Sequence, residues 1–358
     1  MRSEQSLCHR DDSASWATGR AGRLRMEHFY RWQRRRRPST YDPAVSRRAL
    51  LLFAALGVIW GIPYLLIKVA VAEVAPATLV FLRCGIGAAV LLPLAAARGQ
   101  LRPVLGHWRA VVAFAAAEVA VPFLALPTAE RTLPSSVTGL LVAAVPLAGV
   151  PIARMFGRPQ HLGRSGAVGM LVGLAGVGAL VGFDLSPAEA AAALLLVPVV
   201  VGYALGPAIV DRYLAGVTTL GVIGCALALD AVGYAPAGLV LWPSHLGAGP
   251  LAAIVVLGVV CTGAAFLVMF ALIAEVGPVR QTLVTYLNPA VAVALGVALL
   301  GEPFTWATGA GFVAILGGSW LVLRRPSPAG LVGSAGEEPT VSKNPTISGA
   351  SWRGESCA

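Results

Sequence analysis

The sequence predicts an all-α membrane protein in which ten transmembrane helices form two inverted five-helix repeats. Of its 358 residues, 57% are hydrophobic and only 12% are charged, whereas a soluble domain carries roughly 25% charged residues. Apolar segments of membrane-spanning length follow one another with very short junctions, and a pattern of residues from the first half returns in the second. Lipid is therefore expected to surround most of the chain.

Each predicted helix is an apolar segment long enough to cross a bilayer. A hydrocarbon core of roughly 30 Å requires about 20 residues of helix. The junctions between these segments leave no room for an extramembrane domain. The ten predicted spans are 49–72, 77–96, 108–127, 135–156, 164–182, 190–209, 217–241, 251–274, 279–300 and 305–323.

Two polar tails are expected to bracket the membrane region and to be disordered in the cytoplasm. Residues 1–48 hold 12 of the 25 arginines, four of them in the run Arg34–Arg37, and residues 324–358 are rich in Gly, Ser and Pro. A basic tail beside a first span is a cytoplasmic retention signal more often than a nucleic-acid site. We therefore expect no nucleic-acid partner. The sequence leaves open whether Met1 or Met26 is the start.

The arginines near the span ends predict the orientation of the chain. Cytoplasmic loops of membrane proteins carry an excess of basic residues. With the N-terminus inside, ten arginines face the cytoplasm and one, Arg131, faces outside, so both termini are expected to be cytoplasmic. The ten are Arg98, Arg102, Arg109, Arg154, Arg158, Arg164, Arg212, Arg280, Arg324 and Arg325.

The first repeat is expected at 49–182 and the second at 189–323. Because each repeat has five spans, an odd number, the second copy must insert upside down. Inverted repeats are typical of secondary transporters, whose substrate site lies between the halves near the middle of the membrane. At offsets of 143–145 residues, Ala129-Glu130, Val145-Pro146 and Gly157-Arg158 correspond to Ala274-Glu275, Asn288-Pro289 and Gly301-Glu302.

Several short motifs of the membrane region match a known family of transporters in order and spacing. They are Trp60-Gly61, Phe81-Leu82-Arg83, Tyr286-Leu287-Asn288-Pro289, Leu300-Gly301-Glu302-Pro303 and Gly317-Gly318. On these motifs the membrane region resembles the EamA family of the drug/metabolite transporter superfamily. The family's Gly-Glu pair before the last span of a repeat is present as Gly301-Glu302 but is replaced by Gly157-Arg158 in the first half. The resemblance implies a ten-helix alternating-access carrier for small metabolites, often an exporter, in a bacterial cytoplasmic membrane.

Four ionisable residues lie inside predicted spans: Lys68, Arg83, Glu118 and Asp230. Such residues are costly in a bilayer and usually face a partner or a wet cavity. Glu118 is a candidate proton or cation site, because desolvation favours the protonated form of a carboxyl; the alternative is a protonated side chain bonded to a neighbouring helix. Asp230 is expected to bond Tyr234, and Arg83 to snorkel or to bond helix-end carbonyls rather than contact substrate.

The first span carries Trp60, Tyr64 and Lys68 on one helical face. An amine head group could bind against the two rings, and Lys68 could meet a substrate carboxylate. The alternative is an interfacial aromatic belt with a snorkelling lysine.

The ninth span places Gln281, Thr285 and Asn288 on one face, with Tyr286 adjacent. These polar groups either line a cavity or form hydrogen bonds between helices. We expect corresponding spans of the two halves to line the cavity, so that Trp60 and Tyr64 face Tyr203 and the Tyr286/Asn288 face. Leu92 and Leu321 are expected to face lipid. Glycines at small-xxx-small spacing predict helix packing: Gly166, Gly169, Gly173 and Gly176, and the pair Gly202 and Gly206.

The sequence contains no motif for catalysis, metal or cofactor binding. We therefore expect no enzymatic activity, no cofactor and no catalytic residue. The best interpretation is a secondary transporter, an exporter of amino acids or related amines, with a small-molecule substrate, proton or cation coupling and homodimer formation left open. Multidrug efflux is the first alternative. An intramembrane enzyme on lipid-linked substrates and a non-transporting scaffold are more distant alternatives.

Overall fold

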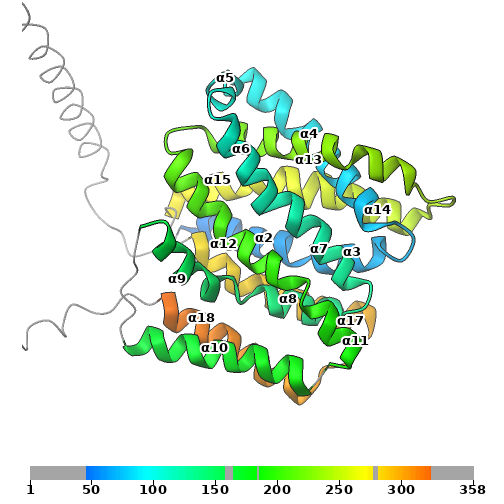
Figure 1. Ribbon diagram of the computed structural model, residues 1–358, viewed down its shortest axis with the longest axis vertical. Helices are drawn as coiled ribbons and strands as arrows, with labels where there is room; N and C mark the ends of the chain where they lie inside the picture. Colours follow the sequence, from blue (N-terminus) through cyan, green and yellow to red (C-terminus); the bar gives the residue numbers. More distant parts are fainter. Residues whose placement is uncertain (1–45, 158–163, 184, 277–280, 324–358) are drawn as a thin grey trace, which may run out of the picture. The chain divides into compact units, whose positions relative to one another are not determined.

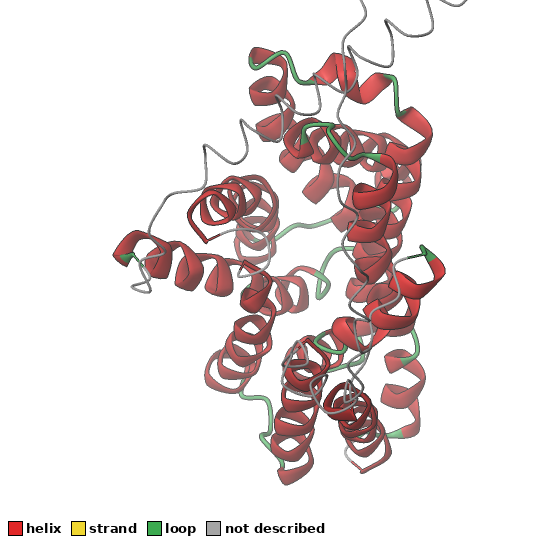
Figure 2. Cartoon of the chain, turned by 90° about the vertical axis from the view of Figure 1, so that its left-hand side faces the viewer, coloured by secondary structure: helices red, strands yellow, loops and turns green. Residues whose placement is uncertain are grey.

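The computed structural model describes residues 46–157, 164–183, 185–276 and 281–323. All regular structure in these residues is helical, and no strand occurs in them (Figure 2). The chain divides into a unit Met1–Leu50 and a unit Leu51–Ala358, and the second unit contains the helices discussed below. The two predicted polar tails, 1–48 and 324–358, lie almost wholly outside the described residues.

Eight helical segments are long and apolar enough to cross a membrane, judged by length and composition. Two shorter apolar helices, Val284–Leu300 and Trp306–Val322, follow them. All-helical membrane architecture is confirmed, whereas the count of ten spans stays a prediction. The eight segments are Arg47–Ala70, Pro76–Ala97, Trp108–Glu130, Ser135–Met155, Arg164–Val181, Pro187–Tyr213, Thr219–Val240 and Ala248–Val276.

Most of these segments are divided into shorter elements. In the first half the elements are α2 (Arg47–Gly61), α3 (Pro63–Ala70), α4 (Pro76–Ala97), α5 (Leu101–Leu105), α6 (Trp108–Phe114), η1 (Ala115–Ala120), α7 (Val121–Glu130), α8 (Ser135–Val142), α9 (Val145–Met155) and α10 (Arg164–Phe183). In the second half they are α11 (Pro187–Ala193), α12 (Leu196–Tyr213), α13 (Thr219–Val240), α14 (Ala248–Gly258), η2 (Val259–Ala264), α15 (Ala265–Val276), η3 (Thr282–Tyr286), α17 (Leu287–Leu300) and α18 (Trp306–Leu323).

One interruption recurs at the same place in both halves. The third and eighth segments each contain one π-helical turn, Ala115–Ala120 and Val259–Ala264, which lie 144 residues apart. The break before Pro63 at the start of α3 is not repeated, because Pro207, at the same offset, lies inside the continuous helix α12. The duplicated sequence pattern therefore corresponds to a duplicated π-helical turn but not to a full duplication of the helix breaks.

Corresponding helices of the two halves pack against each other. α4 packs on α13, α8 on α17, and α10 on α18. In Figure 1, α10 and α18 lie side by side along their length. A Cβ added at Gly176 would lie 2.7 Å from the Ala314 Cβ, and one at Gly318 would lie 2.5 Å from the Gly169 carbonyl oxygen. The predicted packing role is confirmed for Gly169, Gly173 and Gly176, where a Cβ would collide with a neighbouring residue, and stays a prediction for Gly166.

The first and third segments cross over to the other half. α3 packs on α14, and α7 and η1 pack on α12. The largest buried cluster joins Tyr64 of α3, Leu140 of α8 and Leu257 of α14. This arrangement brings the polar residues of α3, η1, α7 and α12 into the interior of the second unit.

Candidate functional site

Polar and ionisable side chains from four helical segments meet inside the protein. Tyr64 of α3 and Tyr203 of α12 lie close enough to interact electrostatically with each other, and both also interact with Arg83 of α4 and Glu130 of α7. Glu118 of η1 interacts with Tyr203. We call Tyr64, Arg83, Glu118, Glu130 and Tyr203 the central polar cluster. Ionisable groups at such depth in a membrane protein are candidates for a substrate or ion site.

Glu118 lies in the π-helical turn of the third segment and packs directly on Gly206. A Cβ at Gly206 would collide with the Glu118 carboxylate, and one at Gly202 would collide with the Ala117 carbonyl oxygen. The two glycines thus allow α12 to approach η1 closely. Glu118 Oε2 is buried and has no hydrogen-bond partner in the described chain. The alternative of a glutamate bonded to a neighbouring helix is therefore not supported for this oxygen. Single π turns often occur at functional positions.

Arg83 is held by two contacts that fix the plane of its guanidinium. Its Nε donates a hydrogen bond to Thr262 Oγ1 at 3.0 Å, and Thr262 Oγ1 donates to the Leu257 carbonyl at 2.8 Å. Its Cζ lies 3.8 Å from the centroid of the Phe123 ring. The expectation that Arg83 snorkels or bonds helix-end carbonyls is wrong, because its Nε donates to a side-chain hydroxyl of the π turn η2 in the other half.

Glu130 at the end of α7 is completely buried. Neither carboxylate oxygen has a hydrogen-bond partner among the residues described. Lys68, Arg83 and Glu302 are near enough to interact with it electrostatically. The sequence indicated Glu130 only as part of the repeated Ala-Glu pair, since it stands at a predicted loop where an acidic residue is ordinary.

Lys68 binds the backbone at the end of α7. Its Nζ donates to the carbonyl oxygens of Glu130 and Leu133, at 2.6 and 2.8 Å. A cation at a helix C-terminus satisfies carbonyls that have no partner within the helix. In this conformation the ammonium group stabilises the α7–α8 connection, and its binding of a substrate carboxylate stays a prediction.

Glu302 of the second half binds the other end of the α7–α8 connection. The Glu302 carboxylate accepts hydrogen bonds from the backbone N–H groups of Ser135 and Ser136, at 2.6 and 2.9 Å. These groups begin α8, where a carboxylate satisfies free donors and the helix dipole favours negative charge. Lys68 and Glu302 therefore fix the α7–α8 connection from both sides. Its counterpart at Arg158 lies outside the described residues.

The aromatic residues predicted for the site divide between two buried clusters. Tyr64 and Tyr203 belong to the same cluster. Trp60 packs in another, where its ring meets Phe266 edge-on at a centroid distance of 6.4 Å. Tyr286 is half-buried, and its hydroxyl has no partner in the described part of the chain. The structure thus brings Tyr64 and Tyr203 together, while Trp60 lies with Phe266 of the eighth segment.

The polar face of the ninth segment lies against the first. In the orientation that satisfies its hydrogen bonds, the Asn288 amide donates to the carbonyls of Val284 and Gly57, at 3.0 and 3.2 Å. Asn288 therefore forms a hydrogen bond between helices, one of the two alternatives left open for this face. Gln281 is buried at the start of η3.

Two expectations outside the site are wrong. Tyr234 does not bond Asp230; its hydroxyl donates to the Ala120 carbonyl at 3.1 Å, and Asp230 Oδ2 is buried without a partner in the described region. Leu92 and Leu321 do not face lipid alone: a Cβ at Gly224 would lie 3.3 Å from Leu92 Cδ2, and one at Gly169 would lie 2.5 Å from Leu321 Cβ. Asp230 and Tyr234, four residues apart on one helix, could contact each other, but Tyr234 instead binds a carbonyl of a neighbouring helix.

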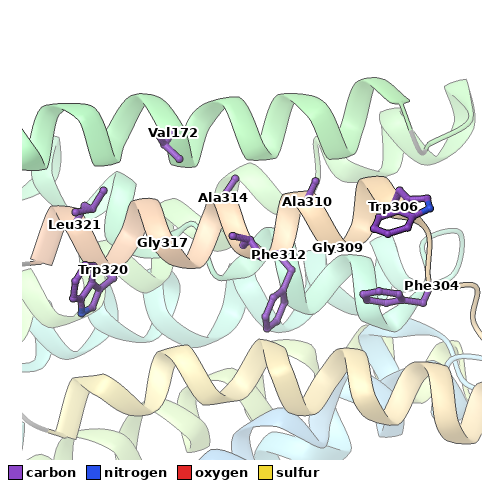
Figure 3. A pocket seen from close by; sticks show the side chains of 11 residues that line it. Val172, Phe304, Trp306, Gly309, Ala310, Phe312, Ala314, Gly317, Trp320 and Leu321 are labelled. Atoms are coloured by element: carbon purple, nitrogen blue, oxygen red, sulfur yellow. The ribbon is translucent and has the colours of Figure 1, made fainter.

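Two open grooves lie away from the central polar cluster. The larger, of about 940 Å³, runs along α18 and is lined by aromatic residues that include Phe304, Phe312 and Trp320. Figure 3 shows Phe312 and Trp320 projecting from the side of α18 that points away from Val172 on α10. The smaller groove, of about 440 Å³, is lined by residues near Trp108 and Tyr213. An apolar groove on a membrane helix is an ordinary lipid contact. Among the described residues, no group of three His, Cys, Asp or Glu side chains could hold a metal ion.

Comparison with known proteins identifies relatives along nearly the whole helical region. The model of the EamA-like transporter family matches residues 47–182 and 190–324. The chain is 29% identical over 267 residues to the uncharacterized inner membrane transporter YedA of Escherichia coli K12 and of strain O157:H7, which covers 72% of this chain and 85% of the relative. A solved crystal structure superposes with a TM-score of 0.55 at 24% identity, covering 76% of this chain and 96% of that one. This likeness shows the fold.

Proposed function

Because the chain belongs to the EamA-like transporter family, we propose that it is a secondary transporter that works by alternating access and exports amino acids or related amines. The proposed location is the bacterial cytoplasmic membrane, with both termini inside. The relatives named above are inner membrane proteins, and the apolar helical segments of this chain support the same environment.

The proposed architecture is two inverted repeats, 49–182 and 189–323, between cytoplasmic tails at 1–48 and 324–358. The recurrence of both π-helical turns at one offset supports the duplication. Five spans in each repeat require opposite insertion, and the site of such a carrier lies between the halves. The cross-packing of α3 on α14 and of α7 on α12 supports a site formed by both halves.

The observation that carries the proposal is the Glu118 carboxyl in the interior of the third segment. One of its oxygens is buried without a partner in the described chain, and the side chain rests on Gly206 of the other half. A carboxyl at an interface between repeats can gain or lose a proton or cation as the halves move, which would couple transport to an ion gradient. Coupling of this kind drives a secondary transporter without a nucleotide.

The proposed substrate-binding residues are those predicted from the sequence. Their roles differ in the structure: Tyr64, Tyr203 and Glu118 belong to the central polar cluster, whereas Lys68 and Asn288 stabilise the backbone. Pockets for small molecules combine apolar walls with a few fixed polar groups. The complete set is Trp60, Tyr64, Lys68, Glu118, Tyr203, Gln281, Tyr286 and Asn288.

Multidrug efflux is the second candidate function. Aromatic side chains such as Trp60 and Phe266, packed edge-on, could accept planar cations in place of amino acids. The charged residues of the central polar cluster favour small polar substrates instead. An enzyme on lipid-linked substrates is less favoured, because the family is one of transporters, and homodimer formation stays open.

Counterflow with purified protein in proteoliposomes tests the proposal. Vesicles preloaded with an unlabelled amino acid should transiently accumulate the labelled form, and a panel of amino acids with their amines identifies the best substrate. Vesicles that show counterflow of ethidium but of no amino acid or amine would support multidrug efflux instead. Vesicles that show none of these exchanges would contradict both.

A further inference from the structure

The smaller of the two open grooves lies where α6 begins and α12 ends, and it combines aromatic with basic side chains. Trp108 and Arg109 of α6 and Tyr213 of α12 line it, together with Ala110 and Ala113. The groove has a volume of about 440 Å³, and no acidic side chain is among the described residues that line it. The larger groove along α18 has no charged residue in its described lining. Basic character therefore distinguishes the smaller groove from an ordinary apolar contact with lipid.

Two arginines lie against the aromatic rings of this groove. The Arg109 Cζ is 5.4 Å from the centroid of the Trp108 ring. The Arg212 Cζ is 5.6 Å from the centroid of the Tyr213 ring. Both distances allow a cation–π attraction. Arg212 also donates a hydrogen bond from Nη1 to the Phe156 carbonyl at 3.2 Å. Since α6 packs on α12, these contacts place one cation on each of the two helices that form the groove.

The groove stands at the ends of two apolar segments. Trp108 is the first residue of Trp108–Glu130, and Tyr213 is the last residue of Pro187–Tyr213. Tryptophan and tyrosine gather at the level of the lipid headgroups. One turn along α6, on the same face as Trp108, Val112 is 44% exposed. An acyl chain that lay along this face of α6 would place its headgroup beside the arginines.

The charge of the groove selects the headgroup. Basic pockets at the ends of membrane helices bind anionic lipid headgroups. Arg109 lines the groove itself, whereas Arg212 lies at its rim beside the exposed Asp211, so Arg109 should contribute more to the attraction. His107 also lines the groove, but its Nδ1 lies 3.1 Å from the Pro103 carbonyl. That contact directs the imidazole to its own turn of the chain.

We infer that this groove binds an anionic phospholipid, with its phosphate beside Arg109 and Arg212 and an acyl chain along α6. Phosphatidylglycerol carries the required net negative charge, and phosphatidylcholine of the same chain length lacks it. The lipid site is separate from the central polar cluster and does not depend on the substrate proposed for transport.

Quenching of Trp108 fluorescence by brominated lipids in reconstituted vesicles tests the site. The vesicles contain phosphatidylcholine and an equal share of either brominated phosphatidylglycerol or brominated phosphatidylcholine. Subtraction of the Trp108→Phe signal isolates Trp108 from the other tryptophans. Phosphatidylglycerol should bind about tenfold more tightly than phosphatidylcholine. Arg109→Gln should lower this preference about fivefold and Arg212→Gln about twofold, in line with the contribution of a single basic residue near the membrane surface.

Arg98→Gln is the matched control, because Arg98 is exposed at the end of α4, on the same predicted side of the membrane, and does not line the groove. It should retain the preference of the wild type. Soluble glycerol phosphate should leave the quenching unchanged, since it has no acyl chain to bury along α6.

Three results would overturn the lipid site. Equal quenching by the two brominated lipids in the wild type would show that the groove does not select an anionic headgroup. A loss of preference in Arg98→Gln as large as that in Arg109→Gln would assign the preference to the diffuse charge of the surface. Relief of the quenching by glycerol phosphate would identify a soluble anion, and not a lipid, as the occupant.

Discussion

The carboxylate of Glu302 accepts a hydrogen bond from the backbone N–H of Ser135 at 2.6 Å, across 167 positions of sequence. A loop of the second repeat thereby caps a helix of the first. Lys68 holds the other end of the same connection. The two contacts therefore fix both ends of the α7–α8 connection, which the sequence predicts on the outer side.

Loss of the Glu302 carboxylate should destabilise the protein measurably. Glu302→Gln keeps one acceptor oxygen and removes the charge, so the free energy of unfolding should fall by about 1.5–3 kcal/mol, the range for hydrogen bonds to charged groups. Thermal unfolding in detergent measures the change. Glu73→Gln is the control, because the exposed Glu73 accepts only one backbone N–H, from Gly247 at 2.7 Å. Equal effects of the two substitutions would contradict a larger stabilising contribution from the Glu302 contacts.

The close approach of α12 to the third segment predicts a graded effect of added methyl groups. Gly202→Ala directs a Cβ at the Ala117 backbone carbonyl, which cannot rotate away, and should cost about 1–3 kcal/mol. Gly206→Ala meets the flexible end of Glu118 and should cost less. Gly178→Ala, where a Cβ has open space in α10, should be neutral or slightly stabilising. Unfolding measurements that gave all three the same effect would contradict this packing.

Glu118 should link transport to the proton gradient. Glu118→Gln preserves size and removes the titrating group, so transport should continue at a lower rate that no longer follows the pH difference across the vesicle membrane. Counterflow and gradient-driven uptake, measured on the same preparation, separate the two effects. Asp230→Asn, another buried carboxyl inside a span, should retain the dependence. An unchanged pH dependence in Glu118→Gln would assign Glu118 to packing.

Trp60 and Tyr286 should influence substrate affinity. Removal of either ring from the wall of the proposed cavity should raise the apparent KM by about three- to tenfold, a loss of roughly 1 kcal/mol, with membrane insertion retained. Concentration-dependent uptake by Trp60→Ala and Tyr286→Ala measures this effect. The controls are Val313→Ala and Leu174→Ala, whose side chains are exposed on α18 and α10. If the ring variants match these controls, the cavity does not include the two residues.

The repeated helix breaks were predictable in outline from the sequence. Val145-Pro146 and Asn288-Pro289 mark corresponding positions in the two halves, and α9 and α17 begin beside these prolines. Proline acts through its own backbone, so its effect on a helix is local and can be predicted from the sequence. The π-helical turns carry no such residue and became visible only in the structure.

Partners on neighbouring helices could not be predicted in the same way. Helical spacing showed that Lys68 shares a face with Trp60 and Tyr64, but its acceptors are carbonyls at the end of another helix. Tyr234 bonds Ala120 rather than Asp230 for the same reason. Spacing along one helix fixes which side chains share a face, and the packing of helices decides what that face meets.

Labelling of a Tyr203→Cys variant from each side of the membrane tests alternating access most directly. The variant would carry serine in place of all five cysteines, Cys8, Cys84, Cys225, Cys261 and Cys357, and an impermeant thiol reagent would be applied to right-side-out and to inverted vesicles. A carrier of this kind should be labelled at position 203 from both sides, with substrate changing the ratio. His107→Cys should react only from the cytoplasmic side and His245→Cys only from outside, as the predicted topology requires. Labelling of position 203 from a single side under all conditions would contradict the account.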